Sequence, residues 1–393
     1  MRIGRIFSIL FFLFCISANS QNLREETKVS LITCGPGTEL YSIFGHSALH
    51  IYDPALGLDR VYNYGTFDFD TPNFYVKFSR GKLDYFLNIT NYPSFIYSYE
   101  REGRWVYNQE LNLSLEQKTK IFNFLENNAL PQNKYYQYDF FYDNCSTRLR
   151  DVLEEVLGDE LVYPEISGDK EATTFRELIE EYLVSMPWSD LGIDLALGLP
   201  CDKEADFREM MFLPDYLKDN LQTAILLNDS GERPLVSSQG LVLAERIPEE
   251  LRAKKRVNWI FWILLVFALL TGYLVSPKKM AWFDVPFFVL SGLLGVFILL
   301  LWFATDHSAT KWNLNVLWAL PSWLYGAFLL IAKRINRKFF KIHAIVTFTI
   351  MVFWIVIPQS YHQAVIPITL ALAARSWSWQ KLKFNVSKDT HAA

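Results

Sequence analysis

The sequence has few of the residues that bind metals or nucleotides. Among its 393 residues are four cysteines and six histidines, with no His-Glu-x-x-His pattern and no second cysteine near Cys145. On an extended strand His46 and His50 would lie about 13 Å apart, at ~3.3 Å per residue, which is too far to share one zinc ion. The Gly-Pro-Gly stretch at 35–37 lacks the lysine and the spacing of a phosphate-binding loop. We therefore expect no metal, no cofactor and no nucleic-acid partner.

The chain also has little net charge, −4 at neutral pH, although 51% of its residues are hydrophobic. Residues 28–248 are typical of a soluble α+β domain, in which residues 231–247 are expected to form an extended connector. Residues 257–379 are dominated by long apolar segments, and a polar tail follows at 380–393. The pattern predicts a soluble domain joined to an all-α membrane domain.

Residues 1–20 are typical of an export signal. Two arginines precede an apolar run from Ile6 to Ile16, and the small residues Ala18 and Ser20 suit a signal peptidase. Cys15 lies in this run without the small residue that precedes the cysteine of a lipoprotein signal. We predict a cleaved signal peptide and an exported soluble domain; a retained N-terminal anchor is the alternative.

Cleavage would leave three cysteines, an odd number in an oxidising compartment. One thiol must then stay unpaired unless it bonds another chain. A disulfide between Cys34 and Cys201 would leave Cys145 free, although sequence does not establish the pairing. The count favours Cys145 as a reactive thiol.

The stretch Tyr138–Asp151, YDFFYDNCSTRLRD, joins an aromatic run to the start of an amphipathic helix. Asn144 is a favourable N-cap and Gly158 a favourable stop, with apolar residues between them at three- and four-residue spacing. Cys145 is thus predicted on the first helical turn, where unpaired N–H groups favour a thiolate. The alternative is a small buried core residue, because Cys145 shares its face with Leu149.

A cysteine nucleophile needs a base, and before Cys145 the exported region offers only His46 and His50. In the strand-like sequence YSIFGHSALHIY, His46 follows a glycine and is the more exposed candidate. Asn63, on the next strand-like stretch, is expected to hold the imidazole in one tautomer, as the asparagine of a Cys-His-Asn site does. The predicted catalytic residues are Cys145, His46 and Asn63, with Tyr64 behind them.

Five apolar segments approach the ~20 residues that a helix needs to cross a bilayer. The last two are short or interrupted by proline, so four spans are the alternative. Lysine and arginine gather in the loops at 278–279 and 333–341 and in the tail, which places these regions in the cytoplasm and the soluble domain outside. The predicted spans are Val257–Val275, Val285–Ala304, Leu314–Ala332, Ile342–Ile357 and Ala364–Trp379.

Two loops, Thr305–Asn313 and Gln359–Gln363, would then lie on the same side of the membrane as Cys145. The first contains His307, Lys311 and Asn313 directly beside a predicted span. Polar groups at such positions often have a function, so these three are candidate substrate-binding residues. The alternative is an ordinary loop that is polar because it meets water.

The motifs FGHSALHIY, YNYGTFDF and FYDNCSTRLRD, followed by hydrophobic spans and the loop HSATKWNLN, resemble the Lnb-type periplasmic domain family of Bacteroidetes membrane proteins. More distantly, they are similar to the circularly permuted papain-like fold of the NlpC type, which includes the lecithin retinol acyltransferase group. This resemblance implies Cys145 as nucleophile and His46 as base. The distant group usually has a second histidine or another polar residue on the next strand, where this chain has Asn63.

The resemblance also implies lipoprotein N-acyltransferase activity at the outer face of the inner membrane. A fatty acyl chain would move from a membrane phospholipid, or another diacylglyceryl donor, through a Cys145 thioester to the N-terminal diacylglyceryl-cysteine of a diacylated lipoprotein. Asn144, Arg148 and Tyr64 are further candidates for substrate binding. Arg148 would orient a phosphate or the Asp143 carboxylate; a surface ion pair is its alternative role. The aromatic run before Cys145 would line an acyl groove or simply pack in the core.

Two other classes stay open. One is a membrane-anchored cysteine hydrolase, acting on peptides, amides or lipids with the same Cys145 and His46. The other is a non-enzymatic membrane scaffold in which Cys145 is buried.

Overall fold

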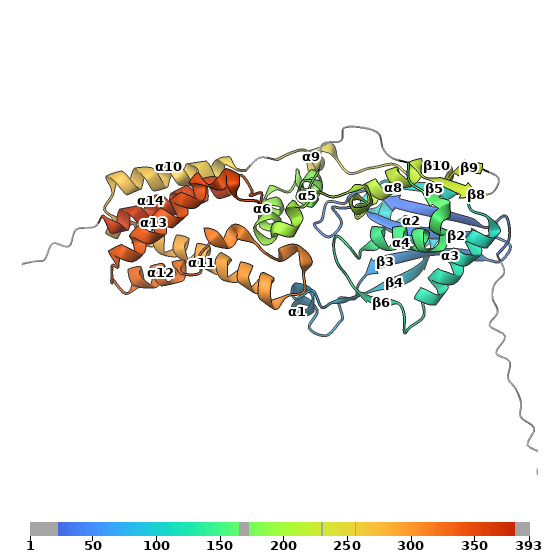
Figure 1. Cartoon of the computed structure of the whole chain (residues 1–393), viewed down its shortest axis with the longest axis horizontal. Helices are drawn as coiled ribbons and strands as arrows, with labels where there is room; N and C mark the ends of the chain where they lie inside the picture. The colour runs from blue at the N-terminus through green and yellow to red at the C-terminus, as the bar shows by residue number, and fades with distance from the viewer. Residues whose placement is uncertain (1–22, 165–172, 229–230, 256, 382–393) are drawn as a thin grey trace, which may run out of the picture.

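The computed structural model describes residues 23–164, 173–228, 231–255 and 257–381. The predicted signal peptide and nearly all of the predicted tail therefore lie outside the described residues. An α+β domain is followed by a helical domain (Figure 1). The first domain is built on a seven-stranded antiparallel sheet in the order β10-β5-β1-β2-β3-β4-β6. Its strands are β1 (Lys28–Cys34), β2 (His46–Asp53), β3 (Leu58–Thr66), β4 (Asp84–Asn91), β5 (Val106–Leu111), β6 (Tyr135–Gln137) and β10 (Val236–Leu243).

Helices cover both faces of this sheet, because successive side chains of a strand point to opposite sides. Leu31 and Leu49 belong to the larger core, which α3, α4 and α8 complete. Their neighbours Ile32 and Ala48 face the other way and pack with α2. The four helices are α2 (Tyr92–Glu102), α3 (Leu115–Asn128), α4 (Cys145–Leu157) and α8 (Pro214–Thr223).

The predicted connector at 231–247 is corrected by the structure. Strand β10 pairs with β5 from Val236 to Leu243 and forms an edge of the main sheet. Strand β9 (Gly231–Pro234) joins a small second sheet with β7 (Leu161–Val162) and β8 (Ile225–Asn228). These residues are therefore part of the soluble domain. Short helices complete it: α1 (Phe74–Ser79), α5 (Phe175–Leu183), α6 (Pro187–Ala196), α7 (Phe207–Met210) and α9 (Glu249–Arg252).

The helical domain contains a fully buried ion pair. Arg375 on α14 bonds both carboxylate oxygens of Asp284 on α11 at 2.7 and 2.8 Å, and the Trp379 indole donates to the same carboxylate at 2.7 Å. Because a charge in an apolar environment is costly unless it is paired, this contact holds α14 against α11. The helices are α10 (Trp259–Leu274), α11 (Ala281–Ala304), α12 (Trp323–Ile331), α13 (Arg337–Val352) and α14 (Val365–Gln380).

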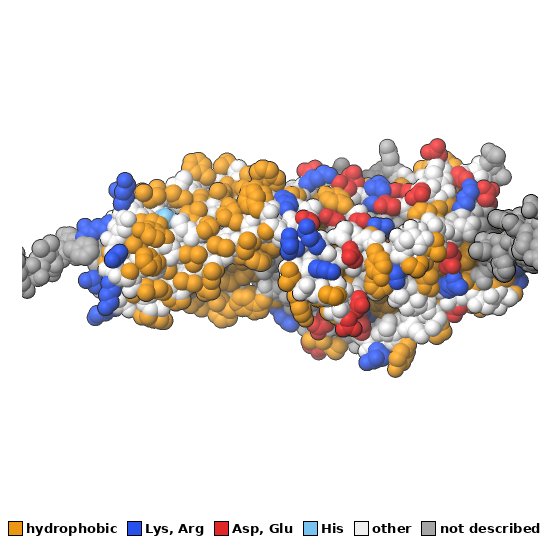
Figure 2. Space-filling model, turned by 90° about the horizontal axis from the view of Figure 1, so that it is seen from below, with side chains coloured by type: hydrophobic (Ala, Val, Ile, Leu, Met, Phe, Trp, Pro, Cys, Tyr) orange, Lys and Arg blue, Asp and Glu red, His pale blue; other side chains and the backbone are white. Residues whose placement is uncertain are grey.

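These helices overlap the five predicted spans, but their lengths differ. Within the described chain, one helical segment is long and apolar enough to cross a bilayer, Pro277–Ala304, while Trp259–Leu274 is apolar but shorter. The predicted span Leu314–Ala332 contains only a short 3-10 helix and α12, since Pro321 interrupts it. On the face shown in Figure 2, hydrophobic side chains predominate over the helical domain, with Lys and Arg at its far end, whereas charged side chains of both signs are scattered over the α+β domain.

Candidate functional site

Helix α4 begins at Cys145, as predicted, and Asn144 caps it. The Asn144 Oδ1 accepts the N–H groups of Ser146 and Thr147 at 2.8 and 2.9 Å. Its Nδ2 donates to the carbonyls of Phe140 and Phe212, both at 2.8 Å. Asn144, predicted to bind substrate, therefore uses both amide atoms to hold the start of the nucleophile helix in place.

His46 stands at the start of β2, and its side chain lines the same cavity as the Cys145 thiol. Burial raises the pKa of the Cys145 thiol, but the charge of His46, its hydrogen bond, the Ser47 backbone N–H and the Ser146 hydroxyl together outweigh it. The pKa of Cys145 lies below its ordinary value as a result. The geometry thus favours a thiolate at the first turn of α4.

Asn63 contacts the imidazole from β3, with its Oδ1 3.3 Å from His46 Nε2. The Asn63 Nδ2 donates to Val61 O at 3.3 Å and to Thr90 Oγ1 at 3.2 Å, so its oxygen faces the ring as an acceptor. In a neutral imidazole held this way, His46 Nε2 is the protonated nitrogen that donates to Asn63, and Nδ1 carries no proton. The structure thus brings the three predicted catalytic residues together, with His46 beside both Cys145 and Asn63.

Two glycines at the site lie close to other segments of the chain. Gly45 and Gly65 have φ of 80° and 83°, a region that other residues rarely adopt. A Cβ on Gly45 would meet Cys34 O at 2.8 Å, and one on Gly65 would lie 3.5 Å from the Cys145 Cβ. Gly65 therefore lets the end of β3 lie against the start of α4, and Gly45 lets the turn before β2 lie against the end of β1.

Cys145 and His46 line a cavity of about 440 Å³ together with Asn144. This volume falls in the range of ~300–1,000 Å³ that is usual for ligand sites. The walls are predominantly apolar and aromatic, so the cavity suits a long apolar group that carries one reactive polar centre. Among the wall residues are Phe44, Phe67, Phe74, Tyr85, Tyr138 and Phe140.

Arg148 and Tyr64, predicted to bind substrate, do not line this cavity. Arg148 forms a two-pronged ion pair with Asp143, and its guanidinium lies 3.9 Å from the centre of the Tyr136 ring. Tyr64 is 1% exposed and belongs to the core. Of the two partners expected for Arg148, a phosphate and the Asp143 carboxylate, the structure shows Asp143.

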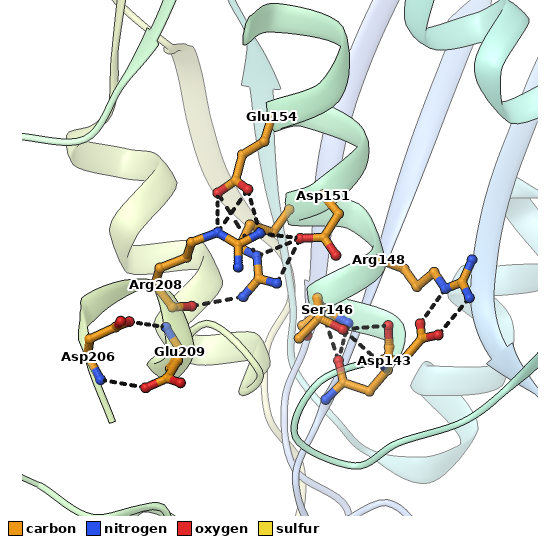
Figure 3. Close-up of polar contacts among 11 residues, drawn as sticks. Asp143, Ser146, Arg148, Asp151, Glu154, Asp206, Arg208 and Glu209 are labelled. Atoms are coloured by element: carbon orange, nitrogen blue, oxygen red, sulfur yellow. Dashed lines mark hydrogen bonds and ion pairs between the residues drawn. The ribbon is translucent and has the colours of Figure 1, made fainter. Parts of the chain in front are cut away.

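Figure 3 shows a second set of ion pairs on α4, beside that of Arg148. Arg208, at α7, contacts Asp151 at 2.7 Å and Glu154 at 2.6 Å. Arg150 donates to the carbonyl of Arg208 at 2.9 Å. These contacts fix α4 along its length as well as at its start.

The three loop candidates lie outside the Cys145 cavity. The Nζ of Lys311 donates to the carbonyls of Trp302 and Thr305 at 2.8 and 2.5 Å, so it caps the end of α11. Asn313 is fully buried and donates to Leu195 O at 2.9 Å. His307 lines a smaller cavity of about 100 Å³, which shares Phe78, Tyr85, Tyr138 and Phe140 with the larger one.

Two serines near the sulfur were missed by sequence reasoning. Ser47 and Ser146 are fully buried, with their hydroxyl oxygens 3.1 Å apart, and the Ser146 oxygen lies 3.9 Å from the Cys145 sulfur. Ser47 directly follows His46 and Ser146 directly follows Cys145 in the sequence, and this adjacency could have indicated that both serines lie near the sulfur. The aromatic residues 67–78 were also missed, because nothing local marks them as part of a cavity.

The disulfide considered between Cys34 and Cys201 is not formed. Both thiols are free and buried, and Cys201 donates to the carbonyl of Ala309 at 3.3 Å. Burial raises the pKa of Cys201 to about 12, so this thiol is inert. In the described ranges no group of three His, Cys, Asp or Glu side chains is arranged to hold a metal ion.

Two family models match the chain. The Lnb N-terminal periplasmic domain matches residues 18–181, and the Lnb transmembrane domain matches residues 256–385. Comparisons with curated proteins and with solved structures gave no significant match. The matches cover the part of the α+β domain that contains His46, Asn63 and Cys145, and then the helical domain. The protein is a member of the Lnb family, with a periplasmic N-terminal domain and a transmembrane domain.

Proposed function

We propose that the protein is a lipoprotein N-acyltransferase of the bacterial inner membrane, with Cys145 as nucleophile, His46 as base and Asn63 as the residue that orients the imidazole. The observation that carries this proposal is the position of the Cys145–His46 pair in an aromatic cavity beside a transmembrane domain. A helix that begins with the cysteine and packs on an antiparallel sheet supports a circularly permuted papain-like fold. The acyl donor is a membrane phospholipid or another diacylglyceryl lipid, and the acceptor is a diacylated lipoprotein.

In the first half-reaction, His46 Nδ1 takes the thiol proton as Cys145 Sγ attacks the ester carbonyl of the donor. The N–H groups of Ser146 and Thr147 are bonded to Asn144, so we assign the Cys145 N–H to the oxyanion. The ester C–O bond breaks, and the lysolipid oxygen takes the proton from His46. The acyl group is left on Cys145 as a thioester.

In the second half-reaction, the α-amino group of the diacylglyceryl-cysteine attacks the thioester carbonyl. His46 accepts a proton from the amine, the C–S bond breaks and Cys145 leaves as a thiolate, which is then reprotonated. The product is an amide-linked third acyl chain. Attack by water in place of the amine would give the hydrolase that is the alternative function.

The test is mass spectrometry of lipoprotein N-terminal peptides from cells whose only copy of the protein is wild type or Cys145→Ser. We expect triacylated termini with the wild type and diacylated termini with the variant, at equal membrane abundance. Cys201→Ser is the matched control, since serine can keep the bond to Ala309 O and should leave acylation unchanged. Identical acylation with wild type and Cys145→Ser would reject the proposal.

Two further variants test the other two residues, with triacylation as the measurement for His46 and the rate of Cys145 acylation as the measurement for Asn63. His46→Ala removes the base and is expected to abolish triacylation, as Cys145→Ser does. Asn63→Ala removes only the acceptor for His46 Nε2 and should slow thioester formation by roughly 10- to 100-fold. An Asn63→Ala protein that forms the thioester at the wild-type rate would remove Asn63 from the mechanism.

A further inference from the structure

The segment between β3 and β4 exposes apolar side chains. We call residues 67–82 the portal segment; it contains α1. Phe69, Tyr75, Val76 and Phe78 are 69%, 78%, 58% and 50% exposed. A contiguous apolar patch on a soluble domain usually marks a surface that another molecule or a membrane covers.

The portal segment is attached to the end of the long apolar helix α11. The His307 ring nitrogen Nε2 lies 3.1 Å from Phe78 O, and the Asp306 N–H donates to Arg80 O at 2.9 Å. Lys82 forms an ion pair with Asp306 at 3.5 Å. Figure 1 shows α1 directly beside this end of α11. Because α11 ends at Ala304, α1 lies at the level where that helix leaves the bilayer.

The inner side of the portal segment forms a wall of the Cys145 cavity. Phe69, Phe74, Tyr75 and Phe78 all line it. Their rings form one cluster, with Phe69 4.9 Å and Phe78 6.1 Å from Phe74 between ring centres. Three of these four side chains are also at least half exposed, so the same aromatic cluster faces both the cavity and the outside.

We propose that the portal segment lies in the outer leaflet of the membrane and that a lipid acyl chain passes along it from the bilayer to Cys145. The occupant of the exposed face is the bilayer, because the portal segment is held at the end of a transmembrane helix by three contacts. Lys77 and Arg80 can extend toward lipid headgroups while the aromatic rings meet the acyl chains. The membrane contact stands on its own; the passage of the acyl donor rests on the proposed function.

Fluorescence quenching tests the membrane contact. Val76→Cys is introduced into full-length Cys145→Ser protein, labelled with an environment-sensitive nitrobenzoxadiazole fluorophore and placed in nanodiscs that contain nitroxide-labelled phospholipid. We expect strong quenching at Val76 and little at Tyr97→Cys, a helical control site on α2 with 60% exposure against 58% for Val76. Protein without the added cysteine corrects for label on other thiols. Equal, weak quenching at both sites would overturn the proposal.

A charge substitution tests the passage of the donor. Val76 does not line the cavity, so Val76→Asp changes the exposed face alone. Acylation of Cys145 from phospholipid vesicles should fall by roughly fivefold or more, because an interfacial charge opposes insertion, while acylation by a water-soluble short-chain ester should be unchanged. Equal rates from vesicles for variant and wild type would overturn the passage. If neither donor acylates the wild type, the proposed function fails, and the quenching result still decides the membrane contact.

Discussion

The reactivity of Cys145 depends on a balance between burial and its neighbours. The same chain contains Cys34, a fully buried thiol whose pKa burial raises far above its ordinary value. At Cys145 burial acts in the same direction, but His46, the Ser47 N–H and Ser146 reverse the net effect on the pKa. The difference between an inert and a reactive thiol is therefore set by these few contacts and not by exposure alone.

Replacing His46 should move the titration of Cys145 to higher pH. In His46→Ala the charge and hydrogen bond that lower the thiol pKa are lost, while burial, which raises it, remains. The pKa of the Cys145 thiol would therefore rise, and the variant would need a higher pH than the wild type to form the thiolate. Iodoacetamide alkylation near neutral pH should slow, because the thiolate fraction falls roughly tenfold each time the thiol pKa rises by one. Alkylation rates measured across pH check this.

The control for this titration is His50→Ala. His50 lies on the same strand but pairs with Asp59 at 2.7 Å and stacks on Tyr92. Its loss should leave the Cys145 alkylation profile where it is in the wild type. Superimposable profiles for His46→Ala and the wild type would contradict the assigned cause of the low pKa.

At the scale of elements, the turn before α4 links the nucleophile to the membrane domain. Asp139 Oδ1 accepts the N–H groups of Phe141 and Tyr142 at 2.9 and 3.1 Å, and Asp139 and Asp143 exchange backbone hydrogen bonds. The other oxygen of Asp139 accepts the Ser308 hydroxyl at 2.5 Å, from the loop after α11. The position of Cys145 thus depends on a residue of the membrane domain.

Ser308→Ala should weaken this link without touching the cavity that holds Cys145. Loss of a hydrogen bond to a carboxylate costs roughly 1.5–3 kcal/mol, so we expect lower thermal stability and slower Cys145 acylation, even from a soluble ester. Ser308→Thr keeps the hydroxyl and should restore both. Slow acylation that threonine does not restore would show that bulk or loop shape matters and not the bond to Asp139.

In the whole molecule, the two domains are joined through a buried polar region around α5 and α6. Arg176 is 1% exposed and pairs with Asp194 at 2.8 Å and Asp202 at 2.9 Å. Asp202 also accepts the backbone N–H of Ser360, which belongs to the membrane domain, at 3.0 Å. Asn313 adds its bond to Leu195 O. Ser360 and Asn313, from the two loops of the membrane domain, thus join it to the α+β domain.

Removing Arg176 should be far more damaging than removing a surface arginine. Arg176→Met leaves two buried carboxylates without their partner, at a cost of roughly 3–5 kcal/mol. Arg208→Met breaks the ion pairs of a half-exposed side chain and should cost about 1 kcal/mol or less. Thermal unfolding of the two variants in detergent measures the difference. Equal losses of stability would contradict the claim that the buried ion pairs of Arg176 stabilise the junction between the domains.

The sequence by itself determined the features that depend on neighbouring residues. The N-cap at Asn144, the start of α4 at Cys145 and its end before Gly158 follow from local capping, and the apolar segments follow from composition. Family membership was also visible in the short motifs around His46 and Cys145. Asn63 was named only as a polar residue on the strand after His46, and its contact with the imidazole depends on the pairing of β2 with β3.

Only the tertiary structure decided how distant segments meet. The cavity combines residues near 41–46, 65–85, 138–145 and 212–214, which the sheet register and the docking of α4 bring together. The same long-range packing brought Asn313 into the domain junction and made residues 236–243 an edge strand. No short pattern encodes such contacts, because their free energy comes from surfaces that are buried only when the whole chain folds.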